Sequence, residues 1–293
     1  MLSVLIPTYN YNIVPLVEEI KEQLNRLEIN YEILVYDDGS HSKLNEYNSS
    51  ITNRINCDFK ALPTNIGRSA IRNLLSKDAK FNNLLFIDAG TFPKNKRFIK
   101  NYISQLHHDV IIGGMTHLKT SPKKPYKLRW LYTKNREGHE TTASKNKVIC
   151  SSNFLIKKDI ILSNPFDETI KKYGCEDVVF FNTLIMKNYE MHHIKNPVIH
   201  DALDDSATFI NKTEQAIQNL ITLLNSKKID KNHYNLSRAY IKLEKYKLTG
   251  IISFLYKGIK PVLNLNFQSN YPSLFLYDFY RLGYFCTLKQ NKS

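Results

Sequence analysis

The first 90 residues alternate short apolar runs with stretches in which apolar residues recur every three or four positions. The runs at 2–7, 31–36 and 84–87 are typical of buried β-strands. The stretches at 13–27 and 67–79 are typical of helices that bury one face. This order of strands and helices predicts an α/β fold with a mainly parallel sheet, whose ligands bind beyond the carboxyl ends of the strands.

Three acidic residues stand where these predicted strands end. Asp37 and Asp38 directly follow the second apolar run, and Asp88 follows the third. Surface turns favour aspartate in any protein. Because parallel strands end at one edge of a sheet, the three carboxylates are nevertheless candidates for a shared site.

The second half of the chain has a different character. Residues 116–146 are basic and weakly periodic, which predicts a mobile loop over the site. A strand is predicted within 148–156, and a helix over 174–187 opens with Glu176 and Asp177. Acids also favour the first turn of any helix, so this pair is open to a structural interpretation. Amphipathic helices are predicted at 211–225 and 233–260.

Composition narrows the classes of function. The chain has 293 residues, 42% of them hydrophobic, and a net charge of +14, so a folded protein with affinity for phosphates is expected. Four cysteines without a C-x-x-C pair argue against a zinc knuckle and suit a reducing compartment. We expect neither a signal peptide nor a membrane span. Nucleic-acid binding would depend on charge alone, since no pattern of a nucleic-acid-binding fold is present.

Seven short motifs, taken together and in order, carry a resemblance to a known family. They are "SVLIPTYN", "ILVYDDGS", "NIGRSAIRN", "LLFIDAG", "NFLIKKD", "GCEDVVFF" and "NPVIH", within residues 1 to about 205. The sequence resembles inverting family 2 glycosyltransferases of the GT-A fold, of the bacterial glycan-biosynthesis type. The resemblance implies a nucleotide-sugar-binding half at 1–115, an acceptor-binding half at 116–205 with the basic loop 116–146, and a helical extension at 206–293.

In such enzymes an acceptor hydroxyl attacks the anomeric carbon of a nucleotide sugar, and a diphosphate leaves. By resemblance, Asp38 holds the base, while Asp37 has either a structural or a ribose-binding role. Gly67 and Arg68 would lie near the base and the phosphates. The full implied set of nucleotide-binding residues is Pro7, Thr8, Tyr9, Asp37, Asp38, Gly67, Arg68 and Asp88.

The "ED" motif supplies the expected catalytic groups. Asp177 is the favoured general base for the acceptor hydroxyl, with Glu176 as the second candidate. In many relatives a histidine precedes this pair, whereas Cys175 stands here. This difference concerns the acceptor environment more than the base.

The metal site of the family is altered. Most members have Asp-x-Asp after this strand and bind Mg²⁺ or Mn²⁺ there, but the second acid is replaced here by Gly90. Three alternatives are open: a weakened site on Asp88, His200, water and phosphates; charge neutralisation by lysines and arginines of the basic loop; or an inactive site.

The resemblance and the basic charge suggest further partners. Arg129, Trp130, Arg136 and Glu137 are candidates to cover the diphosphate or the acceptor. The expected function is transfer of a hexose or N-acetylhexosamine, from a UDP-sugar by preference, to a glycan or lipid-linked acceptor. The alternative is a catalytically idle nucleotide-sugar-binding protein. The C-terminal helices suit an anionic membrane surface, and the expected location is the cytoplasm, including the inner face of its membrane.

Overall fold

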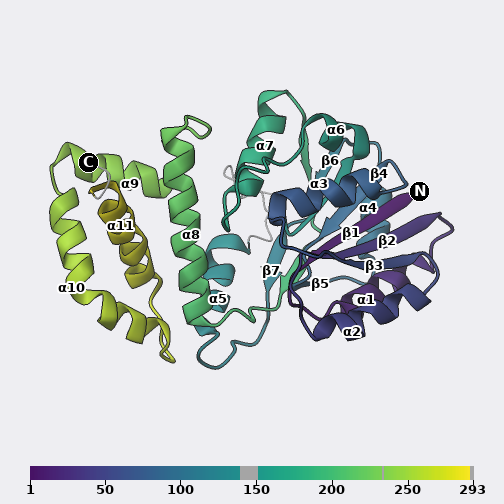
Figure 1. Cartoon of the computed structure of the whole chain (residues 1–293), viewed down its shortest axis with the longest axis horizontal. Coiled ribbons are helices and arrows are strands. Elements are labelled where there is room, and N and C mark those ends of the chain that lie inside the picture. Colours follow the sequence, from purple (N-terminus) through teal and green to yellow (C-terminus); the bar gives the residue numbers. More distant parts are fainter. Residues whose placement is uncertain (139–150, 233, 291–293) are drawn as a thin grey trace. The chain divides into compact units, whose positions relative to one another are not determined.

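A computed structural model of the protein describes residues 1–138, 151–232 and 234–290. Its contacts divide the chain into two compact units (Figure 1). The first unit holds Met1–Leu118, Lys134–Lys171 and Glu176–Asp201, and the second holds Lys119–Thr133, Lys172–Cys175 and Ala202–Ser293. The helical extension expected from residue 206 is thus joined in the second unit by part of the predicted basic loop.

The first unit is built on a seven-stranded mixed sheet of order β3-β2-β1-β4-β8-β6-β9. β3, β2, β1 and β4 are parallel, β8 runs antiparallel to both β4 and β6, and β9 is parallel to β6. A smaller sheet has the order β5-β10-β7. The strands are β1 Leu2–Thr8, β2 Tyr31–Asp37, β3 Cys57–Ala61, β4 Asn83–Ile87, β5 Thr91–Pro93, β6 Val110–Ile112, β7 Met115–His117, β8 Asn153–Lys157, β9 Met191–His193 and β10 Val198–His200.

Helices cover both faces of the large sheet (Figure 1). β1 alternates its side chains between them: Val4 and Ile6 join the core beneath α1 and α4, whereas Leu5 joins the core beneath α3, α6 and α7. Burial of each large aliphatic side chain contributes about 1.5–3 kcal/mol. The helices of this unit are α1 Val14–Leu24, α2 Leu44–Asn48, α3 Arg68–Asp78, α4 Phe98–Ile103, α6 Lys158–Ser163 and α7 Glu176–Met186, with a 3₁₀ turn at Ser49–Asn53. A π turn at Thr133–Glu137 has its first residue in the second unit and the rest in this one.

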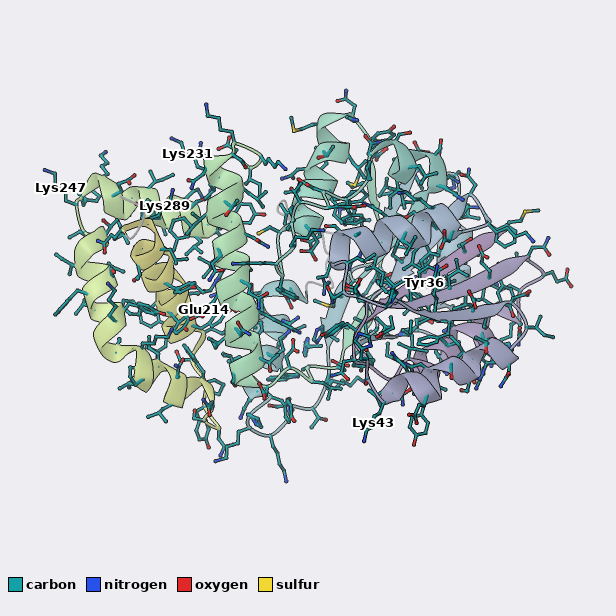
Figure 2. All side chains as sticks on the ribbon, viewed as in Figure 1. Tyr36, Lys43, Glu214, Lys231, Lys247 and Lys289 are labelled. Atoms are coloured by element: carbon teal, nitrogen blue, oxygen red, sulfur yellow. The ribbon has the colours of Figure 1, made fainter. Side chains whose placement is uncertain are left out.

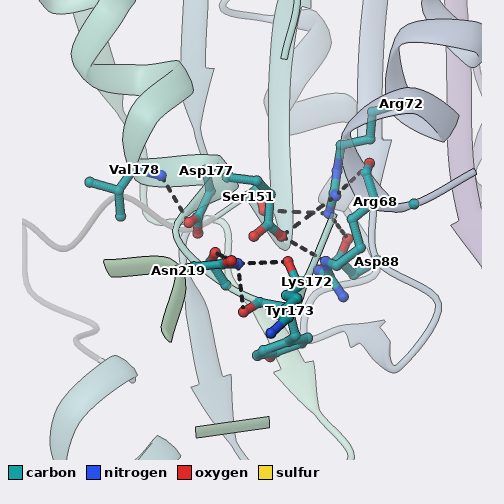
Figure 3. Close-up of polar contacts among 12 residues, drawn as sticks. Arg68, Arg72, Asp88, Ser151, Lys172, Tyr173, Asp177, Val178 and Asn219 are labelled. Atoms are coloured by element: carbon teal, nitrogen blue, oxygen red, sulfur yellow. Dashed lines mark hydrogen bonds and ion pairs between the residues drawn. The ribbon is translucent and has the colours of Figure 1, made fainter. Parts of the chain in front are cut away.

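The second unit is helical. Its helices are α5 Lys127–Tyr132, α8 Ser206–Asn225, α9 Asn235–Lys245, α10 Thr249–Phe267 and α11 Leu274–Gln290. An aromatic core joins them, in which Phe209 of α8 stacks on Tyr277 of α11 at 5.4 Å between ring centroids. Asn219 of α8 donates to the carbonyls of Lys172, Tyr173 and Gly174 at 2.8, 3.2 and 3.0 Å, and so fixes the segment that precedes α7 (Figure 3).

The mixed α/β fold predicted from the sequence is confirmed, and so are its first three strands and its helices at α1, α3, α7 and α8. The prediction of a loop at 116–146 was wrong for 127–137, which are helical. There Leu128, Arg129 and Trp130 are buried, although the neighbouring lysines hide the apolar pattern. The helix expected over 233–260 divides into α9 and α10 at Lys247, whose φ is +57°. No described helix is long and apolar enough to span a bilayer.

Candidate active site

The carboxyl ends of β1 and β2 lie side by side, and their register places two of the predicted aspartates, Asp37 and Asp38, next to the end of β1. Thr8 pairs with Asp37, and the amide of Asp38 donates to the Thr8 carbonyl at 2.9 Å. Asp37 is fully buried, and its carboxylate accepts hydrogen bonds from the backbone and hydroxyl of Ser40 and from the Asn45 amide. These bonds hold the turn after β2, which favours the structural alternative for Asp37.

The second aspartate ties this turn to the loop before α3. The Asp38 carboxylate accepts from the backbone N–H groups of Ile66 and Gly67 at 2.7 and 3.0 Å. Burial raises the pKa of Asp38, and these two hydrogen bonds partly offset the effect. Gly67 has φ +92°, and a Cβ there would meet only the Lys171 carbonyl, at 3.9 Å. Glycine is therefore needed at this position for its backbone conformation and not for space.

α3 begins with the arginine that links the acids of the site. The Nε of Arg68 donates to Glu176 Oε1 at 2.7 Å, and a terminal nitrogen lies 3.5 Å from Asp88 Oδ2 (Figure 3). One turn later Arg72 lies 2.7 Å from Asp88 Oδ1 and 4.0 Å from Glu176 Oε1. The i, i+4 spacing places both guanidinium groups on one face of the helix, between the two acids.

Arg72 is the buried centre of this network. Its side chain is 1% exposed and lies against the Phe166 ring, and it also donates to the Arg68 carbonyl at 3.2 Å. Its Nε, like Glu176 Oε2, is a buried polar atom without a hydrogen-bond partner among the described residues. A buried charge of this kind is costly unless it is paired. Asp88 and Glu176 therefore stabilise the charge of Arg72, and Arg72 in turn orients their carboxylates. The sequence hypothesis missed Arg72, although it stands within the quoted "NIGRSAIRN" motif.

The two acids at the start of α7 have opposite electrostatic environments. Burial opposes ionisation of Glu176, but Arg68 and Arg72 outweigh it and lower the pKa of that carboxyl. Burial, and then the neighbouring charge of Glu176, raise the pKa of Asp177 to about 7. The Asp177 carboxylate accepts from the Val178 amide at 2.8 Å (Figure 3). A carboxylate that titrates near neutrality can take up a proton from a substrate hydroxyl.

The residues at the altered metal motif meet on the small sheet. His200 of β10 pairs with Thr91 of β5, and the amide of Asp201 donates to the Gly90 carbonyl at 3.2 Å. The Tyr11 hydroxyl donates to the Asp201 carboxylate. Asp201 was not among the residues singled out in the sequence, because it follows its strand without any pattern of its own. No group of three metal-ligating side chains occurs among the described residues.

The remaining predicted residues are placed as follows. Thr8 is buried and its hydroxyl has no partner in the described part of the chain, whereas Tyr9 is 58% exposed beyond the end of β1. Pro7 lies within β1 and pairs with Tyr36. Cys175 precedes α7 with φ +71°.

The basic-loop residues do not form one group. Arg129 and Trp130 are buried in the second unit, where the Arg129 guanidinium lies 5.1 Å from the centre of the Phe209 ring. Arg136 and Glu137 belong to the part of the π turn assigned to the first unit. The part of the predicted loop at 139–146 lies outside the described residues. Arg129 and Trp130 are therefore core residues of α5, and their predicted role in covering the diphosphate lacks support here.

The three acids proposed for one site are connected partly by hydrogen bonds and ion pairs and partly through the backbone, from Gly67 to Arg68 and from Glu176 to Asp177. Asp38 holds Gly67, the next residue Arg68 contacts Asp88 and Glu176, and Asp177 follows Glu176. The result is one cluster at the carboxyl ends of β2 and β4 and at the first turns of α3 and α7. It combines one partly exposed guanidinium group, that of Arg68, which can bind phosphate, with a carboxyl poised to accept a proton.

Comparison with known proteins decides the family. The model of "Glycosyl transferase family 2" matches residues 3–162. The chain belongs to glycosyl transferase family 2. That match contains β1, β2, α3 and Asp88, but not α7, so it covers the donor half of the cluster and not the candidate base. No curated protein matches the sequence.

A solved glycosyltransferase structure agrees with the GT-A fold of this family 2 member. The mannosyltransferase PcManGT from Pyrobaculum calidifontis, solved with GDP-Man and Mn²⁺, aligns with a TM-score of 0.53 and 14% identity over 76% of this chain. This chain covers 64% of that protein. TarS residues 1–349 from S. aureus, also solved with UDP-GlcNAc, align with a TM-score of 0.48. The identity is 19% for the first TarS structure and 18% for the one with UDP-GlcNAc, and each alignment covers 99% of this chain and 91% of that TarS chain. At such identities we take the fold alone from PcManGT, and we draw no argument from TarS.

Proposed function

We propose that this family 2 protein transfers a hexose or N-acetylhexosamine from a nucleoside-diphosphate donor, a UDP-sugar by preference, to a glycan or lipid-linked acceptor. The observation that carries the proposal is the pairing of a carboxyl of pKa about 7, Asp177, with the arginine-held acids Asp88 and Glu176. The first provides a base near neutral pH, and Arg68, which holds the acids and has a side chain 41% exposed, provides a guanidinium group for phosphate.

Each residue has a distinct role in this proposal. Asp38 fixes the loop at Gly67, so that the backbone near the nucleotide keeps one conformation. Arg68, whose side chain is 41% exposed, reaches the donor diphosphate as it leaves, while the buried Arg72 holds Asp88 in place. Asp177 accepts the acceptor's proton as its oxygen attacks the anomeric carbon. A single displacement of this kind inverts the anomeric centre.

The experiment is a thermal-shift screen against UDP-, GDP-, TDP- and CMP-sugars, followed by measurement of nucleotide release from each donor that binds. We expect UDP-sugars to raise the melting temperature and to release UDP slowly without acceptor. If no nucleotide sugar raises the melting temperature, the proposal is refuted.

Gly90 favours the second candidate, a nucleotide-sugar-binding protein without activity, because the motif lacks an acid at that position. The same screen separates the two. Binding without release of the nucleotide from any donor, even when candidate acceptors are supplied, supports the idle protein.

We further propose that the second unit docks on an anionic membrane, where lipid-linked acceptors would lie. The outward face of α10 carries exposed apolar side chains, among them Ile251, Phe254, Val262 and Leu265. Exposed Lys247 lies in the turn between α9 and α10 (Figure 2). Exposed Lys257 lies on α10 itself. An apolar helix face beside lysines is the combination that binds the interface of anionic bilayers.

Flotation with vesicles tests this docking. The wild type should float with vesicles that contain phosphatidylglycerol and much less with pure phosphatidylcholine. Phe254→Asp should abolish the difference. Ile55→Asp, at an equally exposed apolar side chain of the first unit, serves as the control and should behave as the wild type. Unchanged flotation of Phe254→Asp would refute docking through α10.

A further inference from the structure

The turn that carries the altered metal motif is joined by its backbone to the end of β10. β4 ends at Ile87, and the Asp88 carbonyl accepts from the amide and the hydroxyl of Thr91 at 3.1 and 2.7 Å. β5 then pairs antiparallel with β10, and the Asp201 amide bonds to the Gly90 carbonyl. Gly90 and Asp201 are therefore held opposite each other, although 110 residues separate them in the sequence.

The carboxylate of Asp201 lies where the side chain of residue 90 would begin. A Cβ built on Gly90 would be 3.6 Å from Asp201 Oδ2 and 3.7 Å from Oδ1, which is ordinary van der Waals contact. An aspartate at position 90 would thus direct its carboxylate into the immediate neighbourhood of the Asp201 oxygens.

We infer that Asp201 supplies, from the end of β10, the carboxylate ligand for a divalent cation that position 90 lacks. This inference rests on the proposed function, since the cation would bind together with the donor diphosphate. It replaces the first of the three alternatives for the metal, which placed the site on Asp88 and His200, with a site centred on Asp201.

The guanidinium groups around Asp88 make it a poor ligand for a cation. Both oxygens of Asp88 face guanidinium groups, Oδ1 towards Arg72 and Oδ2 towards Arg68, which compete with a cation. The Asp201 carboxylate accepts from the Tyr11 hydroxyl, and His200 Nδ1 lies 3.9 Å from its Oδ1.

The donor set fits the cation expected in this family. Mg²⁺ and Mn²⁺ are held through carboxylate oxygens, and Mg²⁺ commonly uses only one or two of them, with water and substrate phosphates completing the octahedron. The described residues contain no preformed group of three ligands. The cation is therefore expected to bind tightly only when the diphosphate is present, with Asp201 as the principal protein ligand and His200 beside it.

The test moves the carboxylate from one position to the other. Mn²⁺ binding is followed by electron paramagnetic resonance, with and without UDP, and UDP binding without metal is measured by equilibrium dialysis. We expect Asp201→Asn to weaken Mn²⁺ binding in the presence of UDP at least tenfold while metal-free UDP binding stays unchanged. The double variant Gly90→Asp/Asp201→Asn should regain most of the affinity, because position 90 has room for a Cβ.

The matched control is Asp58→Asn, which removes an exposed carboxylate from β3 of the same unit and should bind Mn²⁺ as the wild type does. Equal Mn²⁺ affinity of Asp201→Asn and wild type would overturn the inference. A wild type that binds UDP but takes up no Mn²⁺ would overturn it too, and would leave the proposed function standing. A wild type that binds no UDP would refute the proposed function and, because the cation is expected to bind with the diphosphate, would overturn this inference with it.

Discussion

Replacement of Asp177 by asparagine separates catalysis from binding and from stability. Asparagine keeps the size of the side chain, and its carbonyl oxygen can still accept from the Val178 amide, but it cannot take a proton. A general base contributes about 10²–10⁴-fold in rate, or about 3–5 kcal/mol. We therefore expect kcat/KM to fall by that factor while donor binding changes little.

The raised pKa of Asp177 adds two pH signatures. In the wild type, kcat/KM should rise with pH up to about 7 and then level off, as this carboxyl loses its proton. The Asp177→Asn variant should lack this limb. A variant with wild-type kcat/KM, or a wild type without a titration near 7, would refute the assignment of the base.

The same carboxyl also makes stability depend on pH. Its pKa is about 7 in the folded protein against an ordinary 3.8, so between these values the folded state holds more protons than the unfolded state. The free energy of unfolding therefore falls as pH rises through this window and is lowest above it. The full pKa difference corresponds to about 4 kcal/mol in the free energy of unfolding. We expect a loss of about 2 kcal/mol across this window, because water reaches the half-buried carboxyl. Relative to wild type, Asp177→Asn should gain stability from pH 4 to 7 in urea unfolding, whereas a constant difference would contradict this reasoning.

Three further substitutions test other parts of the site. Arg72→Met leaves Asp88 and Glu176 without their buried partner and should lower the free energy of unfolding by about 3 kcal/mol, measured in urea; a loss below 1 kcal/mol would show that Arg68 alone suffices. Gly39→Ala should cost at least about 2 kcal/mol by the same measurement, because φ is +64° and a Cβ would lie 2.3 Å from the Thr64 carbonyl carbon; wild-type stability would contradict the close approach. Asp38→Asn should weaken UDP binding about tenfold in calorimetry, since it loosens the Ile66–Gly67 loop; unchanged affinity would remove Asp38 from the nucleotide site.

The regular part of the fold was predictable because its patterns are long. β1 and β2 are seven-residue buried runs, and α1 and α3 repeat their apolar residues over three turns. The acids after these strands could be proposed as neighbours because parallel strands end at one edge. This reasoning grouped Asp38 with Asp88, whereas Asp177, at the start of a helix, was added only through the resemblance of its "ED" motif.

Short elements and long-range pairs were not predictable. β5, β7 and β10 have three residues each, too few to show a two-residue period, so the small sheet was missed and with it the pairing of Gly90 with Asp201. Arg72 gave no signal because an arginine inside a helix is usually solvated. α5 was hidden by the lysines in and around it, although Leu128 and Trp130 are buried.

The central claim is that Asp38, Asp88 and Asp177 belong to one nucleotide-diphosphate site, and a crystal structure with UDP and Mn²⁺ tests it most directly. We predict that the diphosphate contacts Arg68 and that Mn²⁺ binds Asp201. The Asp177 carboxyl should lie on the side of the β-phosphate from which the acceptor would approach. UDP bound elsewhere, or a diphosphate that contacts neither Arg68 nor the turn at Asp88–Gly90, would contradict the account.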